Sequence, residues 1–299
     1  MGKLHDRMEA GVDAQHIALI IPTCGRPDDL AACLRSIAGE ADGSVAQVIV
    51  IDDGADELVV VPPEVGGVPV VKRRNAVRRG AAYSRNLALQ VLADEVDAVG
   101  FLDDDARLTP GWLEAARREL TRARGAVTGP VLRFDRGIVS RARQLRYNDR
   151  YAPLEPGQAV PFLAGGNAMV WRDLLVKAGG FPDTRTMSDR FLVRRLEAAG
   201  GMTHFVPDMV VLHRNSKGLR VAVREAWRAG LLDDTPLTGT ASERLSGGMR
   251  AAVAGEHAPA ALLNVALDAV YLGGRERARR SQWRARGARV VPRASTAKR

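Results

Sequence analysis

The stretch AVGFLDDDA, residues 98–106, joins an apolar run to three consecutive aspartates. An apolar run of this length, closed by polar residues, is typical of a strand that is buried on both faces of a parallel sheet. The same pattern occurs in HIALIIP (16–22), which leads into TCGR, and in AQVIVIDDG (46–54). We therefore predict three buried strands, each with polar side chains at its carboxyl end.

Segments with helical spacing alternate with these strands. We expect a fourth strand over 68–75 and helices over 30–39, 80–93 and 109–123, the last with Thr109 as N-cap and Pro110 at its first position. Such alternation predicts right-handed crossovers and an α/β fold with a single, mostly parallel, Rossmann-like sheet flanked by helices. Ligands of these sheets bind beyond the carboxyl ends of the strands, which is where TCGR, DDG and DDD lie.

The second half of the chain has a less regular pattern. Strands are expected within 127–134, 159–172 and 203–214, and helices from 172, from 188, over 219–232 and over 260–272. The expected domains are a polar leader (1–15), a main domain (16–232, with halves 16–130 and 131–232), a helical C-terminal extension (233–274) and a basic, disordered tail (275–299). The segments 133–160 and 233–259 contain no recognisable motif.

The net charge of +9 is concentrated at one end of the chain. Residues 275–299 hold ten Lys or Arg against one acid, Glu276, whereas 1–274 hold 34 basic and 34 acidic residues. This distribution argues against a nucleic-acid-binding fold, so no nucleic-acid partner is expected. The apolar fraction of 46% excludes a wholly disordered chain, and two cysteines, Cys24 and Cys33, are too few for a disulfide-stapled scaffold. We expect both thiols to be reduced and the protein to be cytoplasmic, since no apolar run resembles a signal peptide or spans a bilayer.

The aspartates at 103–105 predict a divalent-cation site. Asp103 and Asp105 are two residues apart at a strand end and point in similar directions, so they repel one another unless a cation neutralises them. Oxygen ligands favour Mg²⁺ or Mn²⁺, often shared with phosphate groups of a substrate. Arg26, and Arg85 with Asn86, are candidates for binding such phosphates. The alternative is a solvated acidic turn, and the absence of GxxxxGK[ST] and GxGxxG argues against a P-loop or a dinucleotide fold.

These motifs together resemble the family 2 nucleotide-sugar glycosyltransferases of the GT-A fold. The resemblance covers about residues 16–215 and is carried, in chain order, by IALIIPTCGRP, VIVIDDG, NAVRRGAAYSRNLAL, FLDDD and LAGGNAMVWR with the following GGF and SDRFLVRRLEAAG. It implies a hexosyltransferase that uses a nucleoside-diphosphate sugar, expected to be a UDP- or dTDP-sugar, and a Mn²⁺ or Mg²⁺ cofactor. The acceptor would be a carbohydrate, a lipid-linked sugar or a natural product.

The resemblance also implies roles for individual residues. The donor nucleotide and sugar would be bound by Pro22, Thr23, Arg26, Asp53, Arg85, Asp103, Asp104, Gly165, Gly166 and Asn167. Within this set Asp53 would contact the base, and the two glycines with Asn167 would form the floor of the site. Asp105 and His213 would bind the metal.

The implied reaction is a single inverting displacement with Asp189 as general base. The family usually has a Glu-Asp pair at this place, but here Ser188 replaces the Glu. The alternative is that Ser188 or Asp189 only caps a helix. Two other functions remain open from the sequence: a sugar nucleotidyltransferase, and a sugar-nucleotide-binding module with impaired catalysis.

The C-terminal region predicts one of two arrangements. The apolar helix 260–272 and the basic residues after it could form a peripheral contact with anionic lipid through 260–299. The alternative is a core helix followed by a disordered tail.

Overall fold

The computed structural model describes residues 16–184, 187–216, 218–234, 240–243, 245–246, 249 and 257–290. Its described residues divide into two compact units. The first consists of the described residues up to Asp135 together with Arg146–Asn215, and the second consists of Arg136–Leu145 and the residues from Ser216 onward.

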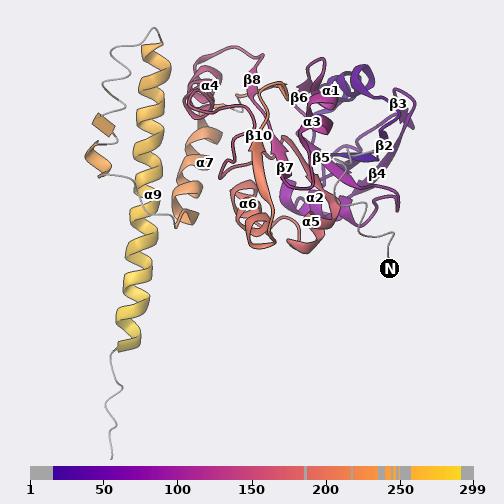
Figure 1. Cartoon of the computed structure of the whole chain (residues 1–299). Helices are drawn as coiled ribbons and strands as arrows, with labels where there is room; N and C mark the ends of the chain where they lie inside the picture. Colours follow the sequence, from indigo (N-terminus) through magenta and orange to yellow (C-terminus); the bar gives the residue numbers. More distant parts are fainter. Residues whose placement is uncertain are drawn as a thin grey trace, which may run out of the picture. The chain divides into compact units, whose positions relative to one another are not determined.

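The first unit is built on an eight-stranded sheet with the order β10-β7-β9-β5-β1-β2-β4-β3. Figure 1 labels several of its strands and the helices around them. Its strands are β1 (Ile17–Thr23), β2 (Val45–Asp52), β3 (Glu64–Val65), β4 (Val68–Arg74), β5 (Ala98–Leu102), β7 (Gly125–Thr128), β9 (Asn167–Trp171) and β10 (Met202–Phe205). Strand β9 is antiparallel to both β5 and β7, and β3 is antiparallel to β4, while the other neighbours are parallel. The predicted α/β fold with a mostly parallel sheet is therefore confirmed.

Helices cover both faces of this sheet, and alternate residues of each central strand enter different hydrophobic clusters. Leu19 and Ile21 of β1 pack in one cluster, whereas Ile20 packs in the other. The first cluster contains side chains of α1 (Pro27–Glu40) and α3 (Trp112–Glu119). The second contains side chains of α2 (Ala81–Leu89), α5 (Arg172–Lys177) and α6 (Ser188–Ala198). Burial on both faces explains why these strands are apolar runs rather than alternating patterns.

A second, three-stranded sheet with the order β6-β11-β8 was not predicted. It consists of β6 (Ala106–Leu108), β8 (Val131–Arg133) and β11 (Val211–His213). The strand expected over 98–106 is therefore wrong in its extent, because the chain leaves the main sheet after Leu102 and begins β6 at Ala106. Strands of three residues are too short to show a sequence period.

Two helices differ from their predicted form. Helix α3 begins at Trp112 with Gly111 as N-cap, so the prediction of Thr109 as N-cap and Pro110 at the first helical position is wrong. The Thr109 hydroxyl donates instead to the carbonyl of Val210, at 2.9 Å, and so is not available to cap the helix. The segment 133–160 contains a helix, α4 (Ile138–Tyr151), which no motif in the sequence indicates.

The second unit contains α7 (Leu219–Leu232) and α9 (Ala258–Val290), which pack side by side. Helix α9 extends far beyond the expected 260–272, so the prediction of a disordered tail from residue 275 is wrong as far as Val290. Alanine and arginine favour the helix there, and Glu276 bonds Arg280 four residues later at 2.7 Å. Residues 291–299 lie outside the described residues. Among the described helices, none has a stretch apolar enough to cross a bilayer.

Candidate active site

The carboxyl ends of β5, β1 and β2 lie side by side in the sheet, which brings the three predicted polar segments together. The backbone N–H of Asp53, after β2, donates to the Thr23 carbonyl at 2.8 Å. The Thr23 hydroxyl then donates to Asp104, after β5, at 2.8 Å. Pro22 is buried in β1 just before this link and does not line an open surface.

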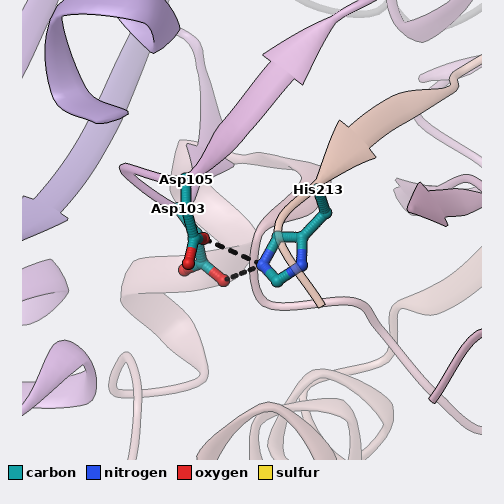
Figure 2. A group of neighbouring side chains, drawn as sticks. All are labelled: Asp103, Asp105 and His213. Carbon is teal, nitrogen blue, oxygen red and sulfur yellow. Dashed lines mark ion pairs between the residues drawn. The ribbon is translucent and has the colours of Figure 1, made fainter. Parts of the chain in front are cut away.

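Asp103 and Asp105 meet the imidazole of His213, as Figure 2 shows. The Nε2 atom of His213 lies 2.9 Å from Asp105 Oδ1 and 3.5 Å from Asp103 Oδ2. This contact exists because β11, which ends in His213, pairs with β6 immediately after the aspartates. The other ring nitrogen, Nδ1, lies 3.0 Å from Asn215 Oδ1. The ring is thus held between an amide and two carboxylates.

The same three side chains fit a divalent cation. One ligand atom from each lies within 4.8 Å of the others, so a single ion can contact all three. Two carboxylates and one imidazole form an oxygen-rich donor set that suits Mn²⁺. Burial alone lowers the pKa of His213, but its hydrogen bonds to Asp103 and Asp105 and their negative charges outweigh burial and raise the pKa to about 10. The carboxylate pair therefore strongly attracts positive charge.

Arg26 provides a second positive group at this cluster. Its Nη2 lies 2.6 Å from Asp104 Oδ1, and its Nη1 pairs with Asp105. Asp104 is fully buried, and burial raises its pKa to about 6 although the charge of Arg26 acts in the opposite direction. Asp104 thus lies beneath the site and holds the first loop through Thr23 and Arg26. The Arg26 side chain keeps 34% of its surface exposed, so it can also reach a ligand.

Arg85 pairs with Asp103, the more exposed of the aspartates. Its Nη2 donates to Asp103 Oδ1 at 2.7 Å, and its guanidinium lies over the ring of Phe181, 5.2 Å from the ring centre. Phe181 is held by Asn86, whose side chain donates to the Phe181 carbonyl at 2.7 Å and accepts from its N–H at 2.9 Å. Asn86 therefore positions Phe181, whose ring lies under the Arg85 guanidinium. This position differs from the expected role of Asn86 as a phosphate ligand.

The Gly165-Gly166 loop before β9 closes against these side chains. A Cβ at Gly166 would lie 2.6 Å from Asp103 Oδ2, and a Cβ at Gly165 would lie 3.3 Å from Arg85 Nη1 and 3.5 Å from the Asp189 Cβ. The missing side chains thus let the loop approach Asp103, Arg85 and Asp189 closely. Asp189 is half-buried in the first turn of α6, after Met187 with a positive φ of 62°.

Asn167 and Asp53 are engaged with the chain itself. The fully buried Asn167 accepts from Trp112 Nε1 at 2.7 Å and donates to the carbonyls of Pro130 and Met209, at 2.9 and 2.8 Å. Its side chain therefore lies below the floor of the site rather than in its surface. The Asp53 carboxylate accepts from Asn75 and from the N–H groups of residues 79 and 80, at 2.7 to 2.8 Å, and so anchors the start of α2.

Some residues that shape the site were missed in the sequence. Phe181 and Asn215 touch Arg85 and His213, respectively, and Asn75 touches Asp53. The GGF motif contains Phe181, so its place in the sequence could have indicated a role beside Arg85. Asn75 opens the NAVRRGAAYSRNLAL motif but was given no role there, and Asn215 stands in no quoted motif. Only the fold brings these two residues to their partners.

Comparisons with known proteins agree with this geometry. Residues 18–179, more than half of the chain, match the family described as glycosyl transferase family 2. An uncharacterized glycosyltransferase of Haemophilus influenzae is 33% identical over 94 residues, which cover 31% of this chain and 31% of that relative. The chain thus matches about a third of that relative's length.

Solved structures share the fold at low sequence identity. The mannosyltransferase PcManGT of Pyrobaculum calidifontis, in complex with GDP-Man and Mn²⁺, has a TM-score of 0.54 and 18% identity, and the match covers 92% of this chain and 76% of that one. GalNAc-T7 with UDP, GalNAc and Mn²⁺ has a TM-score of 0.53 and 15% identity over 68% of this chain and 44% of that one. TarS of S. aureus has a TM-score of 0.51 and 13% identity over 89% of this chain and 92% of that one. The fold is therefore GT-A, and the chain belongs to glycosyl transferase family 2.

Proposed function

We propose that the protein is a metal-dependent, inverting glycosyltransferase that moves a hexose from a UDP- or dTDP-sugar to an acceptor hydroxyl. The observation that carries this proposal is the joint placement of a cation-binding cluster, Asp103, Asp105 and His213, beside Arg85 and a half-buried Asp189. The solved structures with GDP-Man or UDP and with Mn²⁺ support the same ligand classes. The acceptor would be a carbohydrate, a lipid-linked sugar or a natural product.

The proposed roles follow from charge and position. Arg85 and Arg26 would hold the diphosphate, because both are cationic and lie at the aspartate cluster. Asp103, Asp105 and His213 would hold Mn²⁺, or Mg²⁺ in its place, and a bound cation supplies charge stabilisation of the departing nucleoside diphosphate.

Gly165 and Gly166, which have no side chains to project over Asp103 and Asp189, would form the floor beneath the donor sugar. Asp189 would accept the proton of the acceptor hydroxyl as it attacks. Its position in the first turn of α6 keeps the carboxylate near the loop, while its partial exposure allows an acceptor to reach it. Ser188, in place of the usual Glu, would leave acceptor contacts to other residues.

The test separates binding from catalysis with two variants. Asp105→Asn should abolish tight Mn²⁺ binding. Binding is measured by the decrease of the free-ion electron paramagnetic resonance signal on titration with protein, so this variant should leave the signal nearly unchanged. Asp189→Asn should retain Mn²⁺ and nucleotide binding but lower the rate of transfer by at least a hundredfold, in the range of general-base catalysis.

Asp208→Asn is the matched control, because Asp208 has 70% of its side chain exposed and pairs only weakly, at the surface, with Arg118. Unchanged transfer in Asp189→Asn would exclude it as the base. Unchanged Mn²⁺ affinity in Asp105→Asn would refute the metal site, and the proposed function with it.

A further inference from the structure

We propose that one face of α7 is a docking surface for anionic phospholipid membranes. Four large apolar residues recur at every fourth position of this helix: Leu219, Val223, Trp227 and Leu231. Their exposed fractions are 53, 39, 38 and 38%, respectively, although α7 packs on α9. Residues four apart follow one another along the same side of a helix, so these side chains form a continuous apolar row. We call these four residues the apolar row.

A basic row runs beside the apolar row. Arg220, Arg224 and Arg228 each follow a member of the apolar row directly in sequence, and all three are exposed. A helix that presents large apolar side chains next to arginines is suited to the boundary between lipid headgroups and acyl chains. The apolar side chains enter the acyl region, and the guanidinium groups pair with lipid phosphates. Charge complementarity therefore favours an anionic membrane over an uncharged apolar partner.

The charge of the whole second unit points the same way. Arg136–Leu145 and the residues from Ser216 onward contain 19 Lys or Arg and 7 Asp or Glu, whereas the rest of the chain contains 25 and 28. The positive charge of the protein therefore belongs to the unit that carries the apolar row. This surface is distinct from the aspartate cluster, and the inference does not depend on the proposed enzymatic function.

Packing on α9 holds α7 in a defined orientation. A Cβ at Gly230 would lie 2.1 Å from the Tyr271 carbonyl oxygen, and one at Gly274 would lie 2.5 Å from the Trp227 carbonyl oxygen. Only glycines allow this close helix contact, and the Trp227 ring lies beside Gly273 of α9. The contact therefore fixes the apolar row along the edge of the α7–α9 pair, where its members remain 38–53% exposed. The Asp233 carboxylate, just after α7, accepts from the Tyr271 hydroxyl and adds a polar link between the two helices.

The experiment measures binding of the full chain to vesicles made of equal parts phosphatidylglycerol and phosphatidylcholine, with pure phosphatidylcholine vesicles for comparison. Leu219→Gln/Val223→Gln/Leu231→Gln removes the apolar row except its reporter, Trp227. Arg220→Gln/Arg224→Gln/Arg228→Gln removes the basic row and should weaken binding by about a hundredfold, from roughly 1 kcal/mol per residue. Val176→Gln/Met202→Gln is the control, because these residues are also large, apolar and exposed, at 64 and 51%, but lie in the first unit.

Trp227 reports insertion directly. Trp112 and Trp171 are buried, at 0 and 1% exposure, so in a Trp283→Phe background a lipid with brominated acyl chains should quench mainly Trp227. We expect binding to anionic but not neutral vesicles, quenching of Trp227, loss of both in each α7 variant, and no change in the control. Circular dichroism of each variant verifies that α7 and α9 remain folded.

Three outcomes would overturn the proposal. One is no binding to anionic vesicles. Another is binding that does not quench Trp227 and that is lost in Arg277→Gln/Arg279→Gln/Arg280→Gln but kept in the α7 variants. This result would assign the membrane contact to the basic part of α9. The third is a dimer, measured by light scattering, that the apolar-row variant dissociates while vesicle binding stays unchanged, which would assign the row to a second copy of the chain.

Discussion

Replacement of Gly166 by alanine tests how closely the glycine loop packs on Asp103, because it adds a single carbon atom at that contact. The new Cβ would lie 2.6 Å from Asp103 Oδ2 and 2.7 Å from Asp103 Cγ. Optimal contacts between carbon atoms are about 3.5–4.0 Å, so the Asp103 carboxylate must withdraw by about 1 Å. The φ of Gly166 is not positive, so alanine is allowed on the backbone and the whole effect comes from this contact.

The withdrawal would break the 2.7 Å ion pair between Asp103 and Arg85. Loss of one partner of a fully buried pair costs about 3–5 kcal/mol, and because Asp103 keeps 29% exposure we expect a smaller loss of about 1–3 kcal/mol. For a domain of this size that corresponds to a Tm lower by about 2–10 °C. Because Asp103 is also a proposed metal ligand, we expect its displacement to lower Mn²⁺ affinity by at least about tenfold.

Differential scanning fluorimetry and Mn²⁺ titration by electron paramagnetic resonance measure the two effects in one preparation. Gly39→Ala is the control, because a Cβ there meets nothing within 4 Å and the residue lies in the last turn of α1. That variant should raise stability by about 0.5–1 kcal/mol and leave metal affinity unchanged. A Gly166→Ala protein with normal Tm and normal Mn²⁺ affinity would refute the reasoning.

Three further changes have expected outcomes. Asn86→Ala removes two hydrogen bonds to a buried loop and should lower the free energy of unfolding by about 1–3 kcal/mol in urea titrations, an effect that Asn86→Asp should only partly restore. Arg26→Gln removes a cation that competes for Asp105, so calorimetry should find Mn²⁺ bound more tightly but UDP bound more weakly; weaker Mn²⁺ binding would contradict this. Gly230→Ala forces a Cβ to 2.1 Å from the Tyr271 carbonyl oxygen and should destabilise the α7–α9 pair by about 1–3 kcal/mol, measured by thermal unfolding followed by circular dichroism.

The central strands could be predicted because their burial on both faces leaves an unbroken apolar run in the sequence. The polar residues that follow them were predicted to meet because parallel neighbours end at one edge. In contrast, β8 and β11 lie within predicted strands, but their short lengths and their pairing with β6 in a second sheet were not predicted. This pairing brings His213 to the aspartates. His213 was identified only through the family resemblance.

Contacts of single side chains were the least predictable part of the site. Asn86 and Asn167 stand in motifs and were expected to face the ligand, yet both satisfy buried backbone groups instead. An asparagine in a sequence gives no sign of whether its amide group will face a ligand or hold a loop in place. The length of α9 was missed because arginine-rich segments with helix-forming residues and no apolar stripe resemble an unstructured tail.

The antiparallel direction of β9 determines where this fold can accept insertions in its sequence. Because β9 runs against β5 and β7, its first residues lie where those strands finish, and Asn167 pairs with Leu102 immediately before the aspartates. The loop that precedes β9 therefore lies beside the aspartates, whereas the other end of β9, at Trp171, pairs with Ala98 at the opposite edge of the sheet. Insertions upstream of Gly165 can thus change the surface beside the aspartates during evolution without shifting β1, β2 or β5.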